Sequence, residues 1–465
     1  MASKHKELAK NTIIMLVGKV FTQFLSFFLL PLYTHTLSAE DYGAVDLIMS
    51  YITLLVPVIT VQQEMATFRH LIDVRNDRFK RAKVVVTSFK SLVLRLSVFV
   101  IPALIASFFI KWDYFYIVLI AGSMVAISNL LLQIARGFGE NAKYTIGSST
   151  AGVVTILSNL ILICVMHLGA ESILISSALA NLCCSIYLFM SLGIHRHLVI
   201  TKPEKELRNK MLKYSWPLVP NGISWWTINA SDRTIVSIFL GTAMNGIYAV
   251  ANKFPSIISS FLGIFVMSWT ESASVHINDD DRDEFFSSVA HNTVRMFSSL
   301  GILVIAVMPF VFDIIIGSGY REAYNYIPIA MVGVLFNCLV STYSAIYVAK
   351  KKTRQVATTS LLCAVINIVV DLVLIHFIGL YAAMASTAVA YFTMAVYRHF
   401  DLKKYVRIKY RISDLVMATL GIIGISAIYY SGNMMFYIIG AVMAVGYTVG
   451  MNWGIIKKIL KRIKS

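Results

Sequence analysis

Two residues of opposite charge, Asp232 and Arg233, stand side by side in a stretch from Trp216 to Gly241 that is apolar enough to lie in a membrane. Arginine binds phosphate with a planar fork of donors, and a neighbouring carboxylate can orient that fork. Polar and aromatic residues suited to sugar hydroxyls precede the pair on one helix face, namely Asn221, Trp225 and Asn229. This stretch is therefore a candidate site for an anionic, hydroxyl-rich ligand.

Two lysines extend the cationic character of this candidate site. Lys253 lies on the next apolar segment, at the same predicted depth as Arg233, about 10 Å from the outer face. Lys19 lies about 10 Å from the inner face in the first segment. Burying a charge in a membrane costs at least about 2.5 kcal/mol, so such residues are functional candidates. The alternatives are that Asp232 or Asp371 pairs with the cations, and that Lys19 reaches the inner interface.

Acidic residues inside the apolar segments are candidates for supporting or ion-coupling roles. Asp46 and Glu64 end a stripe of polar and kink positions, spaced for one helix face, whose other members are Ser50, Thr53, Pro57 and Thr60. Asp371 shares a face with Asn367 in a later segment. A polar face must meet protein or a wet cavity, not lipid. For serine and threonine, the alternative is hydrogen bonding between packed helices.

Catalytic and metal chemistry find no support in the residue pattern. The five cysteines fall inside apolar runs without metal-ligand spacing, and "RGFGE" at 136–140 opens no phosphate-binding βαβ unit. We therefore expect no enzyme activity, no catalytic residue, no metal and no cofactor.

The composition indicates that transmembrane helices position these residues. The chain of 465 residues is 57% hydrophobic and 14% charged, with a mean hydropathy of +0.72. A soluble domain carries about 25% charged residues. The net charge of +17 sits in short clusters between apolar runs. This distribution indicates membrane topology rather than a nucleic-acid-binding face, so no nucleic acid partner is expected.

Segments of about 20 apolar residues cross a bilayer as helices, and the sequence predicts about fourteen of them. They begin near residues 12, 44, 88, 114, 145, 172, 214, 244, 290, 324, 356, 380, 413 and 434. With the N-terminus inside, the inner segments hold 33 Lys and Arg and the outer loops hold 2. This bias predicts a multi-pass protein of the cytoplasmic membrane with both termini in the cytoplasm.

An internal repeat divides the predicted helices. Leu37 and Gly43, in "LSAEDYGAV", match Leu240 and Gly246, in "LGTAMNGIYAV". The predicted organisation is an all-α polytopic membrane protein with a six-helix half at 1–198, a second six-helix half at 199–411, and two further helices with a basic tail at 412–465. Two such halves around a cavity are typical of transporters.

Two stretches resemble helix pairs of the polysaccharide-repeat-unit flippases (the Wzx type), "NTIIMLVGKVFTQFLSFFLLPLYTHTLSAEDYGAVDLI" and "YSWPLVPNGISWWTINASDRTIVSIFLGTAMNGIYAVANKFPSII". These flippases belong to the multidrug/oligosaccharidyl-lipid/polysaccharide (MOP) exporter superfamily, with the multidrug and toxin extrusion (MATE) antiporters and the lipid II flippases. The resemblance covers essentially the whole chain and implies the MATE-like fold.

The resemblance implies a substrate, an undecaprenyl-diphosphate-linked oligosaccharide such as an O-antigen or capsule repeat unit, turned from the inner to the outer leaflet of a bacterial membrane. It also implies partners in membrane lipid and polysaccharide polymerase machinery, and a groove at the last two helices for the polyprenyl tail. The charge pattern fits a lipid II or teichoic-acid precursor flippase equally well. A cation-coupled drug antiporter would need deep carboxylates, for which Asp46 and Asp371 are the candidates.

Overall fold

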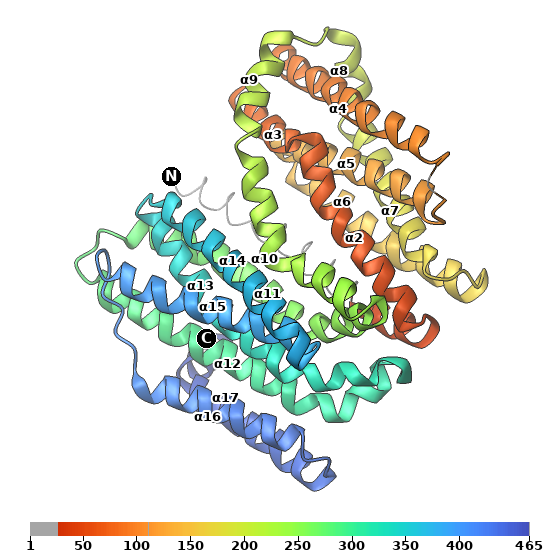
Figure 1. Ribbon diagram of the computed structural model, residues 1–465. Coiled ribbons are helices and arrows are strands. Elements are labelled where there is room, and N and C mark those ends of the chain that lie inside the picture. The colour runs from red at the N-terminus through yellow and green to blue at the C-terminus, as the bar shows by residue number, and fades with distance from the viewer. Residues whose placement is uncertain (1–26, 110, 465) are drawn as a thin grey trace. The chain divides into compact units, whose positions relative to one another are not determined.

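The computed structural model describes residues 27–109 and 111–464, and side chains at 228, 229, 455, 456 and 458–464 are outside the description. Within this part of the chain every regular element is a helix (Figure 1). Contacts divide the protein into two units, one of Ala44–Thr227 with the chain up to Leu37, and one of Ile228–Ser465 with Ser38–Gly43.

The first unit holds a bundle of antiparallel helices (Figure 1). Residues 27–36 are helical. They are followed by α2 (Ala39–Thr60), α3 (Gln63–Asp73), α4 (Arg78–Ala106), α5 (Phe115–Phe138), α6 (Asn141–Asn159) with the π-helical η1 (Leu160–Val165), α7 (Glu171–Ser191), α8 (Ile194–Ile200), α9 (Lys205–Ser215) and the start of α10 (Leu218–Phe239).

The second unit contains the rest of α10 and the elements that follow it. They are α11 (Thr242–His276), α12 (Arg282–Ile315), the 3₁₀ segment η2 (Ser318–Tyr326), α13 (Ile327–Ala349), α14 (Thr353–Ile378), α15 (Tyr381–Leu402), α16 (Ile412–Tyr429) and α17 (Met434–Lys464). The α13 helix packs against both α11 and α15, and α12 packs against α16 and α17. The Arg295 side chain of α12 donates to both oxygens of Asp414 on α16 at 2.9 Å.

Each predicted span from the second onward coincides with a helix, and the first lies largely outside the described residues. Within the described part, eleven helices are long and apolar enough to cross a membrane. The helices α10 and α15 are not among them. Both helices carry polar residues that are buried in the protein, among them Asp232, Ser386 and Arg398. The structure confirms an all-helical, multi-span membrane protein, while the count of fourteen stays a prediction.

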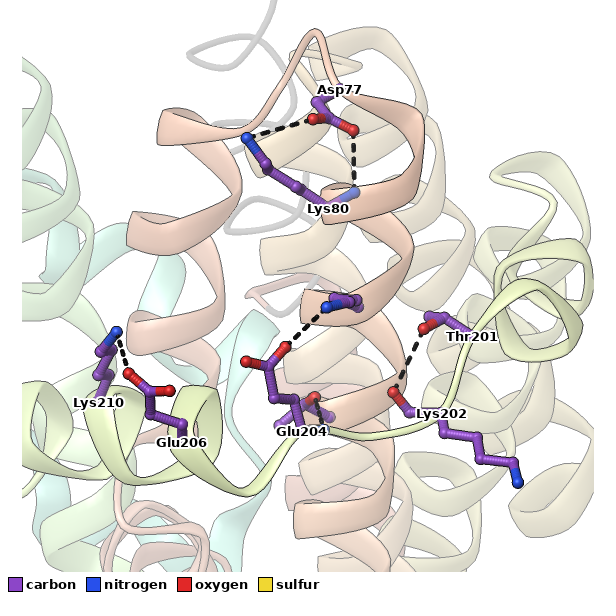
Figure 2. A network of polar contacts seen from close by, with 9 residues as sticks. Asp77, Lys80, Thr201, Lys202, Glu204, Glu206 and Lys210 are labelled. Atoms are coloured by element: carbon purple, nitrogen blue, oxygen red, sulfur yellow. Dashed lines mark hydrogen bonds and ion pairs between the residues drawn. The ribbon is translucent and has the colours of Figure 1, made fainter.

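The start of α4 shows how these helices are delimited. Asp77 precedes the helix and accepts hydrogen bonds from the backbone N–H groups of Phe79 and Lys80, both at 3.0 Å. Figure 2 shows the bond from Lys80. These bonds satisfy two donors that the first helical turn leaves without a partner. The bond from the Lys80 N–H is the main reason that the pKa of Asp77 lies below its usual value.

The polar stripe predicted on one helix is divided by a break. Val61 and Gln62 adopt left-handed conformations, with φ of 53° and 47°, and separate α2 from α3. Pro57 lacks an N–H group, which weakens the helix in the turn before the break. The break frees the carbonyl oxygen of Thr60, which accepts a hydrogen bond from Arg95. The stripe therefore runs as predicted to Thr60, whereas Glu64 belongs to a second, shorter helix.

Arg398 lies on α15 and is 0% exposed. The helix continues to Leu402, so the guanidinium points into the second unit. It donates to Thr359 at 2.7 Å, to Ser344 at 2.5 Å and to the carbonyl of Val340 at 3.0 Å. Neutral acceptors on α13 and α14 thus satisfy a buried cation and join three helices.

The two glycines matched by the internal repeat contact each other's helices. A Cβ on Gly43 would overlap the carbonyl oxygen of Thr242, and a Cβ on Gly246 would overlap that of Ala39. The Asn245 amide donates to the Gly43 carbonyl at 2.7 Å. Ser38–Gly43 consequently belongs to the second unit, because only glycine allows the beginnings of α2 and α11 to approach so closely.

We predict that Gly43→Ala and Gly246→Ala each destabilise the protein by about 1–3 kcal/mol, the range for overpacking a tight contact. Gly424→Ala is the matched control, because a Cβ there meets nothing within 4 Å. Thermal unfolding of purified protein measures the effect. Equal melting temperatures for all three variants would contradict the close contact.

Candidate functional site

Asp232 lies in the middle of α10, is 2% exposed, and accepts hydrogen bonds from three other helices. Tyr248 of α11 donates its hydroxyl to Oδ2 at 2.8 Å, and Thr387 of α15 donates to the same oxygen at 3.0 Å. Asn367 of α14, with its amide nitrogen turned toward Asp232, donates to Oδ1 at 3.0 Å. In that orientation its carbonyl accepts from Ser386 at 3.2 Å. Asp232 is therefore the shared acceptor of three helices.

Asp371 lies one turn beyond Asn367 on α14 and is 0% exposed. Neither carboxylate oxygen has a hydrogen-bond partner among the described residues. The Asp232 carboxyl is near enough to interact electrostatically with that of Asp371. The second unit thus holds a pair of buried carboxyls inside a membrane-spanning bundle. Burying ionisable residues in a membrane costs free energy, and residues of this kind commonly bind ions or carry protons.

A cavity of about 230 Å³ lies beside this cluster, within the second unit. Arg233 lines it, and its guanidinium carbon lies 5.9 Å from the centroid of the Tyr248 ring. The other lining residues include serines, asparagines and aromatic rings, among them Asn252, Ser256, Ser259, Asn337 and Tyr391. The Ser256 hydroxyl donates to the carbonyl of Lys253 at 2.6 Å. The lone pairs of the Ser256 hydroxyl oxygen therefore stay available as acceptors. The cavity combines a cation with hydroxyl and amide groups.

The structure brings together only some of the residues that the sequence predicted. Asp232, Arg233 and Asp371 lie in one cluster with the cavity. Lys253 is half-buried on α11 but is not among the residues that line this cavity. Lys19 lies outside the described residues, and so does the side chain of Asn229.

The remaining predicted residues lie in the first unit. Asp46 is half-buried on α2, and Glu64 on α3 accepts from the hydroxyl of Thr60 at 3.1 Å and lies near Arg95. Asn221 and Trp225 are exposed on the first part of α10. Their proposed contact with a substrate stays a prediction.

Several residues of the site were not identified from the sequence, among them Tyr248, Asn337 and Thr387. Tyr248 follows the repeated glycine in "GIY", and Thr387 lies in the "STAVA" of α15. Both residues could have been recognised as candidates in the sequence, because a hydroxyl on a membrane-spanning helix needs a hydrogen-bond partner. No group of three or more metal-ligating side chains occurs among the described residues.

Fold and site together define a multi-span helical membrane protein, and its fold is shared by solved transporters of the MOP superfamily. The structure is similar to that of the lipid II flippase MurJ in an inward closed conformation, with a TM-score of 0.70 and 14% identity over 96% of this chain and 100% of that chain. It is also similar to an inward-facing multidrug resistance MATE transporter, with a TM-score of 0.65 and 13% identity over 85% of this chain and 98% of that one.

A third similar structure is a MOP superfamily transporter from Pyrococcus furiosus, described as having a binding pocket of reverse polarity, with a TM-score of 0.57 and 12% identity over 85% of this chain and 96% of that chain. Comparison with curated proteins finds no match. The chain belongs to the polysaccharide biosynthesis protein family, whose model matches residues 8–270.

We predict that Asp232→Ala destabilises the protein, because it leaves Tyr248, Thr387 and Asn367 without their acceptor. Leaving a buried donor unsatisfied costs about 1–3 kcal/mol. Asp313→Ala is the control, since Asp313 is exposed on α12. Thermal unfolding in detergent measures both variants, and an unchanged melting temperature for Asp232→Ala would contradict the shared-acceptor role.

Proposed function

We propose that the protein is a flippase that moves a polyprenyl-diphosphate-linked oligosaccharide from the inner to the outer leaflet of a bacterial cytoplasmic membrane. Such a lipid has an anionic, hydroxylated headgroup, which cannot cross hydrocarbon unaided. The proposal requires a cavity that opens in turn to the two sides, as in alternating-access transporters. Membership of the polysaccharide biosynthesis family supports an oligosaccharide as cargo.

The observation that carries the proposal is the cavity that Arg233 lines. Arginine can bind two oxygens of a diphosphate at once, whereas a lysine such as Lys253 acts as a point charge. The amides and hydroxyls around it, such as those of Asn252, Asn337 and Ser256, match the donors and acceptors of a sugar chain. We assign the diphosphate to Arg233, and we keep Lys19 and Lys253 as further ligands on the strength of the sequence.

An apolar cavity in the second unit supports a place for the polyprenyl tail. It has a volume of about 240 Å³ and lies between α12, α13 and α16. Most of its lining residues are aliphatic or aromatic, with Phe297, Phe336 and Ile422 as examples. A polyprenyl chain is a branched hydrocarbon, so burial against such a surface is favourable. We propose that the tail lies here while the headgroup crosses.

The buried carboxyl pair supports a role in energy coupling. The Asp371 side chain has no hydrogen-bond donor beside it among the described residues. In an apolar interior such a carboxyl group is stable either as the neutral acid or as a carboxylate with a bound cation. Asp232 lies in the same cluster and is hydrogen-bonded to Tyr248, which also contacts Arg233. We propose that binding of a proton or metal cation at Asp232 and Asp371 biases the conformation of this unit.

An in-cell glycan export assay tests the proposal. We expect Arg233→Ala and Lys253→Ala to lower export at equal protein level by about 10–100-fold each, the loss for removing a charge-assisted hydrogen bond of about 1.5–3 kcal/mol. Lys253→Ala and Lys19→Ala test the part of the proposal that rests on the sequence alone.

Arg321→Ala is the control, because Arg321 is exposed in η2 and should not affect export. Normal export by Lys19→Ala, Arg233→Ala and Lys253→Ala together would contradict the proposal. Rescue of a strain that lacks its lipid II or teichoic-acid precursor flippase would assign the protein to those cargoes instead. Drug resistance on overexpression, without glycan export, would assign it to the antiporters.

A further inference from the structure

A second polar pocket lies in the first unit, away from the cavity that Arg233 lines. It has a volume of about 170 Å³ and is formed where the beginning of α9 packs against α4. We call it the α4–α9 pocket. Its lining includes Thr87, Lys90, Ser91 and Leu94 of α4, and Lys205 and Arg208 of α9.

The chain before α9 is fixed to α4 by hydrogen bonds and an ion pair. The backbone N–H of Glu204 donates to the Thr87 hydroxyl at 3.1 Å, and Lys83 donates to the Glu204 carboxylate at 3.0 Å. Figure 2 shows that Glu204 points toward α4, whereas Glu206 points toward Lys210 of its own helix. The pocket wall is thus a built part of the fold.

The charges around the pocket favour an anion. Lys90, Lys205 and Arg208 line it together with one carboxylate, Glu204, and that carboxylate is paired with Lys83. Arg95 on α4 lies near enough to Arg208 for the two cations to repel each other. An anion bound between α4 and α9 would reduce this repulsion.

Two neutral groups in the pocket are suited to an oxyanion. Ser91 is 3% exposed, and its hydroxyl oxygen has no hydrogen-bond partner among the described residues. The α9 helix begins at Lys205, which lines the pocket, and the helix has no side-chain cap, so the N–H groups of its first turn lack a capping acceptor. A helix N-terminus with a buried hydroxyl and three cations is a suitable environment for a phosphate.

The apolar surroundings indicate that the phosphate belongs to a lipid. Leu94 lines the pocket one turn further along α4 than Lys90, toward the middle of the span, and is 51% exposed. On α9, Leu212 and Tyr214 are also exposed. A headgroup phosphate at Lys90 would therefore lie above an acyl chain at Leu94, as in basic pockets for anionic lipids at membrane surfaces.

We propose that the α4–α9 pocket binds the phosphate of an anionic phospholipid on the cytoplasmic side of the membrane. The side follows from the predicted topology, in which both α9 and the beginning of α4 lie inside. The ligand is distinct from the cargo, so the proposal is independent of the flippase function. A bound lipid would hold α9 against α4.

Lipid binding by the purified full-length protein tests the proposal, with phosphatidylglycerol as the probe and native mass spectrometry as the measurement. We expect the double variant Lys90→Gln, Arg208→Gln to bind phosphatidylglycerol at least about tenfold more weakly than the wild type. Lys205→Gln changes an exposed residue and provides a second, milder variant should the double variant fail to fold. Lys210→Gln is the matched control, because Lys210 pairs with Glu206 and does not line the pocket.

Unchanged phosphatidylglycerol binding by both pocket variants would overturn the proposal. Three further ligands distinguish the source of the phosphate. Phosphatidylcholine should not compete, because its headgroup is neutral overall. Inorganic phosphate should compete only weakly. Competition by inorganic phosphate as strong as that by phosphatidylglycerol, or preferential binding of undecaprenyl diphosphate to this pocket, would overturn the assignment to a phospholipid.

Discussion

The constraint on which this structure depends is that polar groups inside a membrane must find partners within the protein. Asp232 meets it by accepting hydrogen bonds from Tyr248, Thr387 and Asn367, and so holds α10, α11, α14 and α15 together. Arg398 meets the same constraint as a donor, because its guanidinium donates hydrogen bonds to neutral oxygens elsewhere in the same unit. These two networks fix the helices that enclose the cavity. They also explain why two helices too polar to pass as membrane spans by composition are nonetheless part of the bundle.

Asp232 and Arg233 are adjacent, yet their environments differ. Successive residues of a helix point about 100° apart, so one side chain can be held in the interior while the next lies at a cavity wall. Asp232 is committed to its neighbours, whereas Arg233 is half-buried, lines the cavity and contacts the Tyr248 ring. Tyr248 therefore links the structural acceptor to the proposed ligand of the diphosphate. Asp371, buried beside them, gives the same cluster a group whose charge can change with a bound cation.

Much of the fold follows from the sequence, because hydropathy and the distribution of basic residues depend on the bilayer rather than on distant contacts. The matched glycines of the repeat were visible too, although their meeting at Gly43 and Gly246 depends on packing. The break at Val61–Gln62 was not predictable, since neither residue favours a left-handed conformation. The partners of Asp232 were hidden for a similar reason. A threonine such as Thr387 commonly bonds to its own helix, and only the packing of α15 against α14 brings it to the carboxylate.

The account separates a residue that holds the fold from one that binds the cargo, and ligand-induced thermal stabilisation tests that separation directly. Purified wild-type protein and Arg233→Gln are unfolded with and without undecaprenyl diphosphate. A ligand that binds the native state raises its stability in proportion to the logarithm of the ligand concentration above the Kd. We predict that Arg233→Gln without ligand unfolds within a few degrees of the wild type but loses the ligand-induced rise. A full rise in Arg233→Gln, or loss of its fold, would contradict the role assigned to Arg233.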